Sequence, residues 1–476
     1  MLGRDRASGQ SSRPPVQAVF CIDVRYERLR RHLESSLPGI QTLGFAGFFG
    51  FPISHQKAAS ERHEARCPVL LTPPLHCPEP LTDSEQQQVA MDRKAKRAWK
   101  AFQNSATSCF SFVESFGIGF VAPMLGLGRS KPCCSATQMP ALSDLPTATL
   151  AAMAEGALRN MSLTGNFARL VLICGHGSHS SNNPYASALD CGACGGHAGD
   201  VNARLAATTL NDPAIRRMLA EKGIVIPEDT VFIAGMHDTL NDEVTGFDLQ
   251  ALPESHRSDW ETLKAALSAA GRATREERAE SLGLGNESPE TLDQAIRSRG
   301  TDISQLRPEW GLANNAALVV APRSRTAGLN LKGRVFLHDY DAEADTKFDV
   351  LRLILCAPVV VASWINLQYY ASRVDPVNFG SGDKALHNVL GGIGVMEGNG
   401  GDLRTGLPMQ SIHDGSKFVH EPRRLSVLIE ASRDSLTTVL AELPDVRRLF
   451  DGGWIHLIAL EGDASHRYVD GTWKKI

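Results

Sequence analysis

Residues 16–25 read Val16-Gln17-Ala18-Val19-Phe20-Cys21-Ile22-Asp23-Val24-Arg25. Residues 16–22 form an apolar run that predicts a buried β-strand. Cys21, Asp23 and Arg25 occupy alternate positions, and alternate side chains project to the same side of extended backbone. A thiol, a carboxylate and a guanidinium can therefore converge beyond the end of this strand, which indicates a metal site with a built-in ion pair.

A second apolar run, residues 170–174, leads into another group of candidate ligands. It ends in Gly175-His176-Gly177, and the following loop contains Asp190-Cys191-Gly192-Ala193-Cys194. Zinc favours thiolate and imidazole ligands, and catalytic zinc sites keep one position open. We expect Cys21, His176 and Cys191 to form a Cys2His zinc set whose fourth position is open to water or to Asp23.

Asp23 has two possible roles at such a site. Paired with Arg25, its carboxylate can accept a hydrogen bond from the activated water and orient it; alternatively, it binds the metal and closes the site. Two thiolates neutralise Zn²⁺ and weaken it as a Lewis acid, so a nearby cation and a proton-accepting group would both help. His179, His197 and His237 are candidates for moving the proton, although each is more often an ordinary polar or core histidine.

The other cysteines near this site have simpler interpretations. Cys174 and Cys194 are interpreted as small buried hydrophobes. Cys191 and Cys194 can instead be half of a structural zinc knuckle, but no second CxxC pair stands at a useful spacing in the sequence. A Cys191 nucleophile with His176 as its base is also conceivable, but it leaves the Cys-x-Asp-x-Arg pentad without a role.

The composition narrows the class of protein. The 476 residues are 42% hydrophobic and 21% charged, which is typical of a globular protein, and the net charge of -4 gives no reason to expect a nucleic-acid partner. A basic cluster in residues 93–100 is interpreted as a solvated helix face, with anionic lipid headgroups as the alternative contact. Ten cysteines without regular spacing indicate a reducing, cytoplasmic setting. The most apolar stretch, residues 353–362, is too short to span a bilayer, so we expect any membrane association to be peripheral.

The predicted fold is one α/β domain over residues 16–476, preceded by a flexible tail over residues 1–15. Continuously apolar runs predict a mixed, largely parallel sheet that helices cover on both faces. Strands are expected at residues 16–22, 170–174, 231–235, 317–322, 334–338, 353–355, 359–362, 425–430 and 454–460. Helices are expected at residues 26–36, 83–102, 146–160 and 258–282, and the charged region 253–307 is interpreted as a helical surface insertion. The glycine-rich segments 380–384 and 391–401 do not fit a phosphate loop, so we do not expect nucleotide binding.

The candidate ligand set resembles that of the β-carbonic anhydrases, whose zinc is held by Cys, His and Cys beside an Asp/Arg dyad. That family spaces the second pair His-x-x-Cys, whereas fourteen residues separate His176 from Cys191 here. From about Pro15 to its end, the sequence is more similar to the DabA family, the large subunits of two-component inorganic-carbon transporters. The resemblance rests on residues 21–25, 44–50, 175–178, 182–184, 187–196, 307–312, 364–370 and 401–408.

The resemblance to DabA implies a site and a function. The zinc-site residues would be Cys21, Asp23, His176 and Cys191, with Arg25 completing a catalytic dyad with Asp23, in a β-carbonic-anhydrase-like core. The protein would lie peripherally on the cytoplasmic face of the inner membrane, with the proton-conducting membrane subunit DabB as its partner. Together they would couple energy to one-way hydration of CO2 to bicarbonate, and any carbonic-anhydrase-like turnover would require that partner.

The same residues are compatible with two other functions. The chain could hold zinc structurally and act only as a partner-binding subunit, or it could be a zinc hydrolase of another carbonyl substrate. Family members usually carry a substantial amino-terminal half ahead of the first motif, and we expect this chain to lack it. Tyr26 stands where a small, serine-like residue is expected. Phe45, Phe48, Phe49 and Phe51 are expected to pack beneath the metal site, or alternatively to line an apolar route for CO2 or contact the membrane partner.

Overall fold

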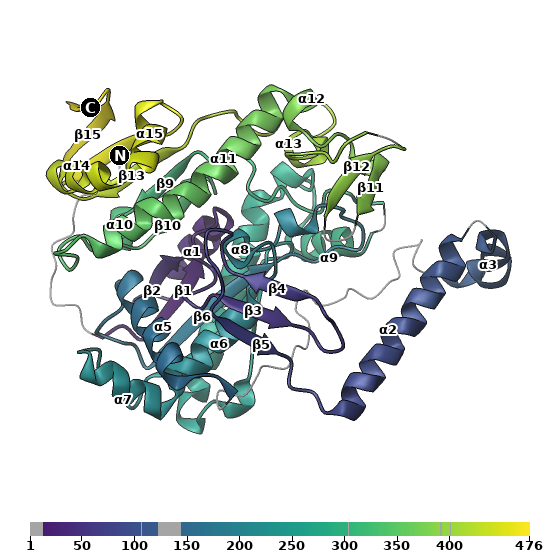
Figure 1. Ribbon diagram of the computed structural model, residues 1–476, viewed down its shortest axis with the longest axis horizontal. Helices are drawn as coiled ribbons and strands as arrows, with labels where there is room; N and C mark the ends of the chain where they lie inside the picture. The colour runs from purple at the N-terminus through teal and green to yellow at the C-terminus, as the bar shows by residue number, and fades with distance from the viewer. Residues whose placement is uncertain (1–12, 106, 122–143, 303, 391–392, 400) are drawn as a thin grey trace.

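The structure is a computed structural model that describes residues 13–105, 107–121, 144–302, 304–390, 393–399 and 401–476. Most of the predicted tail, residues 1–12, lies outside the described residues. Arg13 is described, and its guanidinium donates to Asp229 and to the carbonyl oxygen of Phe167. Figure 1 shows the body of the molecule and a helical arm that extends from it.

The first sheet contains the candidate ligand strands. Its order is β2-β1-β6-β7-β8, in which the first four strands are parallel and β8 is antiparallel to β7. These strands are β1 (Val16–Cys21), β2 (Gln41–Phe45), β6 (Leu170–Gly177), β7 (Val231–Asp238) and β8 (Glu243–Gly246). Because β1 and β6 are parallel neighbours, their carboxyl ends meet at one edge of the sheet.

Helices cover both faces of the first sheet. On one face, Ala18 and Phe20 pack with α1 (Arg25–Ser36) and α8 (Arg257–Arg278). On the other, Val19 packs in a core that contains side chains of α5 (Thr147–Asn160), α6 (Asp200–Asn211) and α7 (Pro213–Glu221). Alternate residues of β1 therefore enter different cores, which explains why its sequence is apolar except at Gln17.

A second sheet is built from the carboxyl-terminal part of the chain. Its order is β10-β9-β13-β14-β15-β16, parallel from β10 to β14 and antiparallel beyond. These strands are β9 (Ala317–Val320), β10 (Val335–His338), β13 (Ser426–Glu430), β14 (His456–Glu461), β15 (Ala464–Val469) and β16 (Thr472–Lys475). The mixed, largely parallel α/β class is thus confirmed, with the strands divided between two main sheets; the single-domain boundary stays a prediction.

Smaller sheets and further helices complete the described fold. The order β4-β3-β5 joins β3 (Ile53–Gln56), β4 (His63–Arg66) and β5 (Leu75–Pro78), and β11 (His387–Leu390) pairs with β12 (Gly394–Glu397). The other α-helices are α2 (Asp83–Asn104), α3 (Cys109–Phe116), α9 (Pro289–Thr301), α10 (Asp349–Cys356), α11 (Pro358–Val374), α12 (Pro376–Phe379), α13 (Met409–Ile412), α14 (Arg433–Glu442) and α15 (Pro444–Asp451). The predicted helical insertion contains α8 and α9, and its described residues form no strand.

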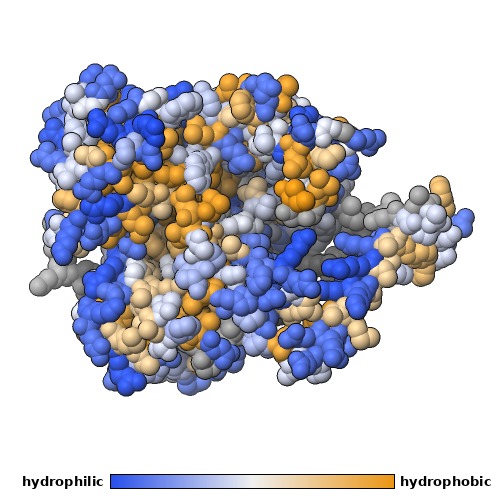
Figure 2. Space-filling view, viewed as in Figure 1, coloured by the Kyte–Doolittle hydropathy of each residue, from blue (hydrophilic) through white to orange (hydrophobic). Residues whose placement is uncertain are grey.

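The strands predicted at residues 353–355 and 359–362 were wrong, because this region forms α10 and α11. Short apolar runs do not distinguish a strand from a buried helix, and Pro358 is tolerated because it stands in the first turn of α11. Among the described residues, one stretch, Asp349–Val374, is long enough and apolar enough to cross a membrane. In its apolar 18-residue window, 39% is buried inside the protein. Core helices of water-soluble proteins also meet this criterion. Figure 2 shows apolar side chains gathered over α10 and α11.

The two main sheets meet at a close backbone contact between β2 and β10. The Gly44 amide donates to Asp339 Oδ2 at 2.6 Å, and the Asp339 amide donates to the Gly44 carbonyl at 2.9 Å. Arg30 of α1 pairs with the same carboxylate at 3.0 Å. A Cβ at position 44 would lie 1.8 Å from the Leu337 carbonyl oxygen, so only glycine permits this approach.

Gly44→Ala is expected to destabilise the protein by about 3 kcal/mol, because the added methyl group must push β10 away from β2. Urea unfolding measures the change in the free energy of unfolding. Gly156→Ala is the matched control, since no atom beyond its own helix lies within 4 Å of the new Cβ and alanine favours a helix. Equal stability of the two variants would contradict the close contact.

Candidate metal centre

The structure brings together the three candidate ligands Cys21, His176 and Cys191. Cys21 is the last residue of β1, His176 lies near the end of β6, and Cys191 lies in the loop that follows. All three side chains are buried, and one potential ligand atom from each lies within 4.8 Å of the others. The two sulfur atoms are 3.9 Å apart. The carboxyl ends of adjacent parallel strands thus place two ligands, and the loop supplies the third.

These donor atoms fit a tetrahedral zinc ion. Two thiolates at zinc's usual bond length of about 2.3 Å would be separated by about 3.8 Å, close to the distance between the Cys21 and Cys191 sulfurs. His176 Nε2 is buried and has no hydrogen-bond partner among the described residues, as expected for a nitrogen reserved for a metal. The cluster therefore offers two sulfurs and one nitrogen, a donor set that zinc favours.

The surroundings of the two thiols would favour binding of a cation. The hydrogen bond with Cys191, together with burial, raises the pKa of Cys21 well above its usual range. The pKa of Cys191 is raised as well, with the neighbouring Cys194 as the largest cause. Both thiols therefore stay protonated at neutral pH by themselves, and a divalent cation would displace their protons to gain two thiolate ligands.

Asp23 is paired with Arg25 beside these ligands. Arg25 Nε and Nη2 donate to the two carboxylate oxygens, each at 2.9 Å. Burial tends to raise the pKa of Asp23, but the charge and hydrogen bonds of Arg25 outweigh it and hold that pKa well below its usual range. Asp23 Oδ2 lies 3.8 Å from His176 Nε2, so the ionised carboxylate is next to the ligands while bound to Arg25.

Three residues behind Arg25 were missed by the sequence analysis. Arg25 Nη1 lies 3.0 Å from Glu309 Oε1 and donates to Thr239 Oγ1 at 2.8 Å. Thr239 in turn donates to Glu309 at 2.6 Å, and Arg278 Nη1 lies 3.8 Å from the other Glu309 oxygen. Glu309 therefore neutralises Arg25 from the side opposite Asp23. Its place in the motif at residues 307–312 was a usable signal, whereas nothing in the sequence marked Thr239.

The candidate proton-moving histidines are each near a carboxylate. His179 Nδ1 makes a short hydrogen bond with Asp238, and buried His237 lies 3.2 Å from Asp242 through Nε2. His197 Nδ1 is 3.8 Å from Glu64, and burial lowers its pKa. Ordinary histidines that lie beside carboxylates explain all three arrangements, so a role in proton transfer stays a prediction.

The interpretation of Cys174 and Cys194 as buried hydrophobes agrees with their positions. Both side chains are buried, and neither belongs to the cluster of potential ligand atoms. Burial raises the pKa of Cys174 to about 12, which makes its thiol unreactive at neutral pH. Cys194 donates a hydrogen bond to the Gly47 carbonyl oxygen at 3.2 Å.

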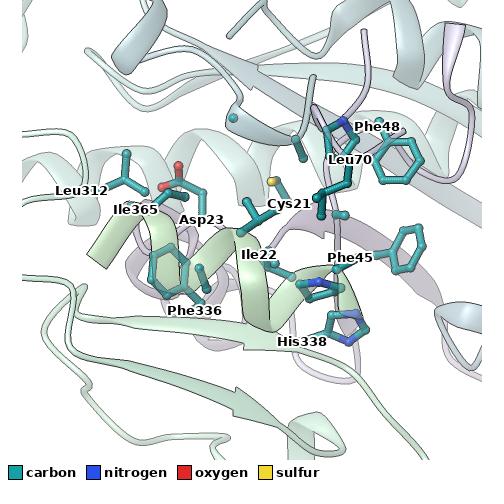
Figure 3. A pocket seen from close by; sticks show the side chains of 18 of the residues that line it. Cys21, Ile22, Asp23, Phe45, Phe48, Leu70, Leu312, Phe336, His338 and Ile365 are labelled. Atoms are coloured by element: carbon teal, nitrogen blue, oxygen red, sulfur yellow. The ribbon is translucent and has the colours of Figure 1, made fainter. Parts of the chain in front are cut away.

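An apolar cavity of about 270 Å³ leads to the cluster of candidate ligands. Cys21, Asp23 and His176 line it together with apolar side chains of α10 and α11, as Figure 3 shows in part. Its lining includes Leu70 and Leu353, which are 43% and 42% exposed, so the cavity is open to solvent. The arrangement would admit a small apolar molecule to the ligands.

The four phenylalanines of residues 45–51 divide between the two predicted roles. Phe49 and Phe51 are fully buried in the core beneath the first sheet. Phe45 and Phe48 line the cavity, and their rings lie 6.5 Å apart. Core packing is therefore correct for Phe49, Phe51 and also Phe45, which belongs to the same core while it lines the cavity. A route for CO2 past Phe45 and Phe48 stays a prediction.

Gly47→Ala should remove most bound metal without changing a ligand. A Cβ at this position would lie 2.6 Å from the Cys191 sulfur and 2.9 Å from the Cys21 sulfur, so both thiols would have to move. Metal content of the purified variant, measured by mass spectrometry, tests this. Gly192→Ala in the same loop is the control, because its nearest atom would be Ile365 Cδ1 at 4.0 Å. Full metal content in both variants would show that the thiols do not hold the metal.

The chain matches one protein family model and several curated proteins. Residues 2–455 match the family model described as "Probable inorganic carbon transporter subunit DabA". Proteins with that name from Roseiflexus sp. (strain RS-1) and Chloroflexus aurantiacus (strain ATCC 29366 / DSM 635 / J-10-fl) are each 49% identical over 100% of this chain and 60% of their own length. The one from Xanthomonas euvesicatoria pv. vesicatoria (strain 85-10) is 52% identical over 98% of this chain and 58% of its own length.

The chain therefore spans about 60% of the length of the curated relatives it matches. No solved structure matches the chain. The predicted β-carbonic-anhydrase-like core accordingly stays a prediction, which rests on the ligand set and not on a structural neighbour.

Proposed function

This chain belongs to the DabA family, and from that premise we propose that it is the zinc-binding subunit of an energy-coupled inorganic-carbon uptake system that hydrates CO2 to bicarbonate. The observation that carries the proposal is the buried cluster of Cys21, His176 and Cys191 beside the Asp23–Arg25 pair, on the wall of an apolar cavity. A structural zinc site would need neither the ion pair nor the cavity.

The residues around the cluster have distinct roles in this proposal. Zinc, when bound, would lower the pKa of a water molecule and so supply a nucleophile near neutral pH. Asp23 is held ionised by Arg25 and would be placed to accept a hydrogen bond from such a water and so orient it. Arg25 fixes the Asp23 carboxylate through two hydrogen bonds, and Glu309 keeps Arg25 electrically compensated.

The cavity favours CO2 over bicarbonate as the entering species. Its wall beyond Asp23 consists mainly of phenylalanine, leucine, isoleucine and valine side chains. A neutral, apolar gas loses little hydration in such a channel, whereas an anion would lose more hydration than the few polar side chains of the lining, among them His338 and Gln368, replace. The apolar wall therefore suits the entry of CO2, and the one-way direction of hydration would depend on the energy coupling that the membrane partner supplies.

A membrane partner completes the proposal. We assign this chain to the cytoplasmic face of the inner membrane, as a peripheral subunit that works with a DabB-like, proton-conducting membrane subunit. The name of the relatives, a transporter subunit, supports association with other components. The partner would supply the energy coupling that the cluster alone does not explain.

The test combines metal analysis with complementation. The purified 476-residue chain should hold one zinc per chain, and with the membrane subunit it should allow a carbonic-anhydrase-deficient host to grow in air. Zinc binding without rescue would instead favour a structural zinc site in a partner-binding subunit. Rescue without bound zinc would refute the metal assignment.

A further inference from the structure

A helical arm extends from the body of the molecule (Figure 1). It consists of α2, α3 and the short helix η1 (Gly117–Phe120). Near its base, Arg93 donates to the Ala59 carbonyl oxygen in the turn between β3 and β4. The far end of the arm, here called the tip and defined as residues 109–120, lies away from both main sheets.

The tip has a small aromatic core of its own. Trp99 and Phe102 of α2 pack against Phe112 of α3, with ring centroids 5.3 Å and 5.4 Å apart. Phe116 approaches Trp99 to 4.9 Å, and Phe112 is buried. These contacts fix α3 against α2, so the outward side chains of the tip are presented by a folded element.

Several of those outward side chains are apolar, although Ser111, Glu114 and Ser115 are exposed beside them. Phe110 is 80% exposed, Val113 is 64% exposed and Ile118 is 87% exposed. Glu114 is the one charged residue in the sequence of the tip. Single exposed apolar residues are common, but several gathered on one projecting element mark an interaction surface.

A basic stripe precedes the tip on α2. At 100° per residue, its four members fall within about 100° of arc on one side of the helix. They are Arg93, Lys96, Arg97 and Lys100. Within the part of the chain that the structure describes, no carboxylate forms an ion pair with any of them. Figure 2 shows hydrophilic residues along α2 and more apolar ones at α3.

We propose that the arm anchors the protein to an anionic lipid bilayer, with Phe110, Val113 and Ile118 inserted among the acyl chains and the basic stripe against the headgroups. The apolar side chains match the acyl-chain layer of such a membrane, and the neighbouring cations, which have no carboxylate partner among the described residues, match its anionic headgroup layer. Trp99 lies between Arg97 and Lys100 in the sequence and is 44% exposed, and aromatic residues favour the membrane interface. The proposal goes beyond the carbon chemistry and does not depend on the metal site.

Flotation of the full-length chain with lipid vesicles tests the anchor. One set of vesicles is phosphatidylcholine alone, and the other contains about one third phosphatidylglycerol to supply negative charge. The tip variant combines Phe110→Ser, Val113→Ser and Ile118→Ser, and the stripe variant changes its four basic residues to Gln. The control variant combines Val225→Ser and Val377→Ser, whose side chains are 66% and 75% exposed elsewhere.

The anchor requires a specific pattern of binding. The natural chain and the control should float with anionic vesicles and much less with neutral ones. The tip variant should bind at least about 10-fold more weakly, because each buried apolar side chain contributes to partitioning. The stripe variant should bind anionic vesicles about 100-fold more weakly than the natural chain. Added salt should likewise weaken the binding of the natural chain to these vesicles.

Other outcomes overturn the proposal. Absence of flotation, or equal flotation of the tip variant and the natural chain, shows that lipid is not the occupant. If the natural chain does not float but binds a membrane protein in detergent, and the tip variant loses that binding, the surface binds a protein instead of lipid. Circular dichroism of the same samples separates loss of the anchor from unfolding, because only unfolding would reduce the helical signal. Metal content measured in parallel tests the proposed function separately, and its outcome does not alter the flotation result.

Discussion

Cys191→Ala should leave the purified protein almost free of zinc. A Cys2His cluster has three protein ligands, and alteration of groups that merely support a ligand already weakens metal binding by about 10- to 100-fold. Loss of a ligand should therefore exceed about 100-fold, enough for a mild chelator to remove the metal during dialysis. Mass spectrometry of the dialysed protein gives the zinc content per chain.

The matched control is Cys174→Ala. Cys174 is also a buried cysteine, two residues before His176 on β6, but it lies outside the ligand cluster. It should retain the zinc of the natural chain, and the same two variants should differ in rescue of a carbonic-anhydrase-deficient host. Full zinc content in Cys191→Ala would show that the cluster is not the metal site.

The part of the site that could be predicted depends on local pattern. Alternation predicted that Cys21, Asp23 and Arg25 converge, and they do, but not on extended backbone, because β1 ends at Cys21 and Arg25 begins α1. His176 was assigned to the same site because it follows a second apolar run and is a zinc-ligand type. Both inferences need only residues close in sequence and a sheet class. The structure joins these residues as expected, with β1 and β6 as neighbours.

The rest of the site depends on contacts that no local pattern contains. Glu309 is 284 residues from Arg25 along the chain, and Thr239 reaches both from the end of β7. The role of Gly47 follows from two sulfur atoms that only the folded chain brings near it. These contacts are set by how the remote segments pack.

The error at α10 and α11 has a different physical origin. Residues 353–362 are apolar because some side chains enter the core and others line the cavity or face outward. With apolar residues on most sides, neither the period of a helix nor that of a strand is visible. The cavity that gives the site its proposed access to CO2 is thus lined by the segment whose secondary structure the sequence did not reveal.

Asp23→Asn should abolish rescue in air while zinc remains bound. The amide has nearly the shape of the carboxylate but cannot hold Arg25 by two charge-assisted hydrogen bonds, and its NH2 group cannot accept one from water. Glu309 still compensates Arg25, so we expect the variant to fold. Growth should fall at least about 100-fold in plating efficiency, the scale of removing an essential acid–base group.

The same variant decides between the two roles of Asp23. As the partner of Arg25 it is dispensable for metal binding, so zinc content should match the natural chain and that of Asp259→Asn, a control in which Asp259 also pairs with an arginine. If Asp23 were instead the fourth ligand, zinc content would fall in the variant and the site would be closed to water. A host rescued normally by Asp23→Asn would refute both the dyad and the hydration chemistry, because no other described carboxylate makes two hydrogen bonds to Arg25 beside the ligand cluster.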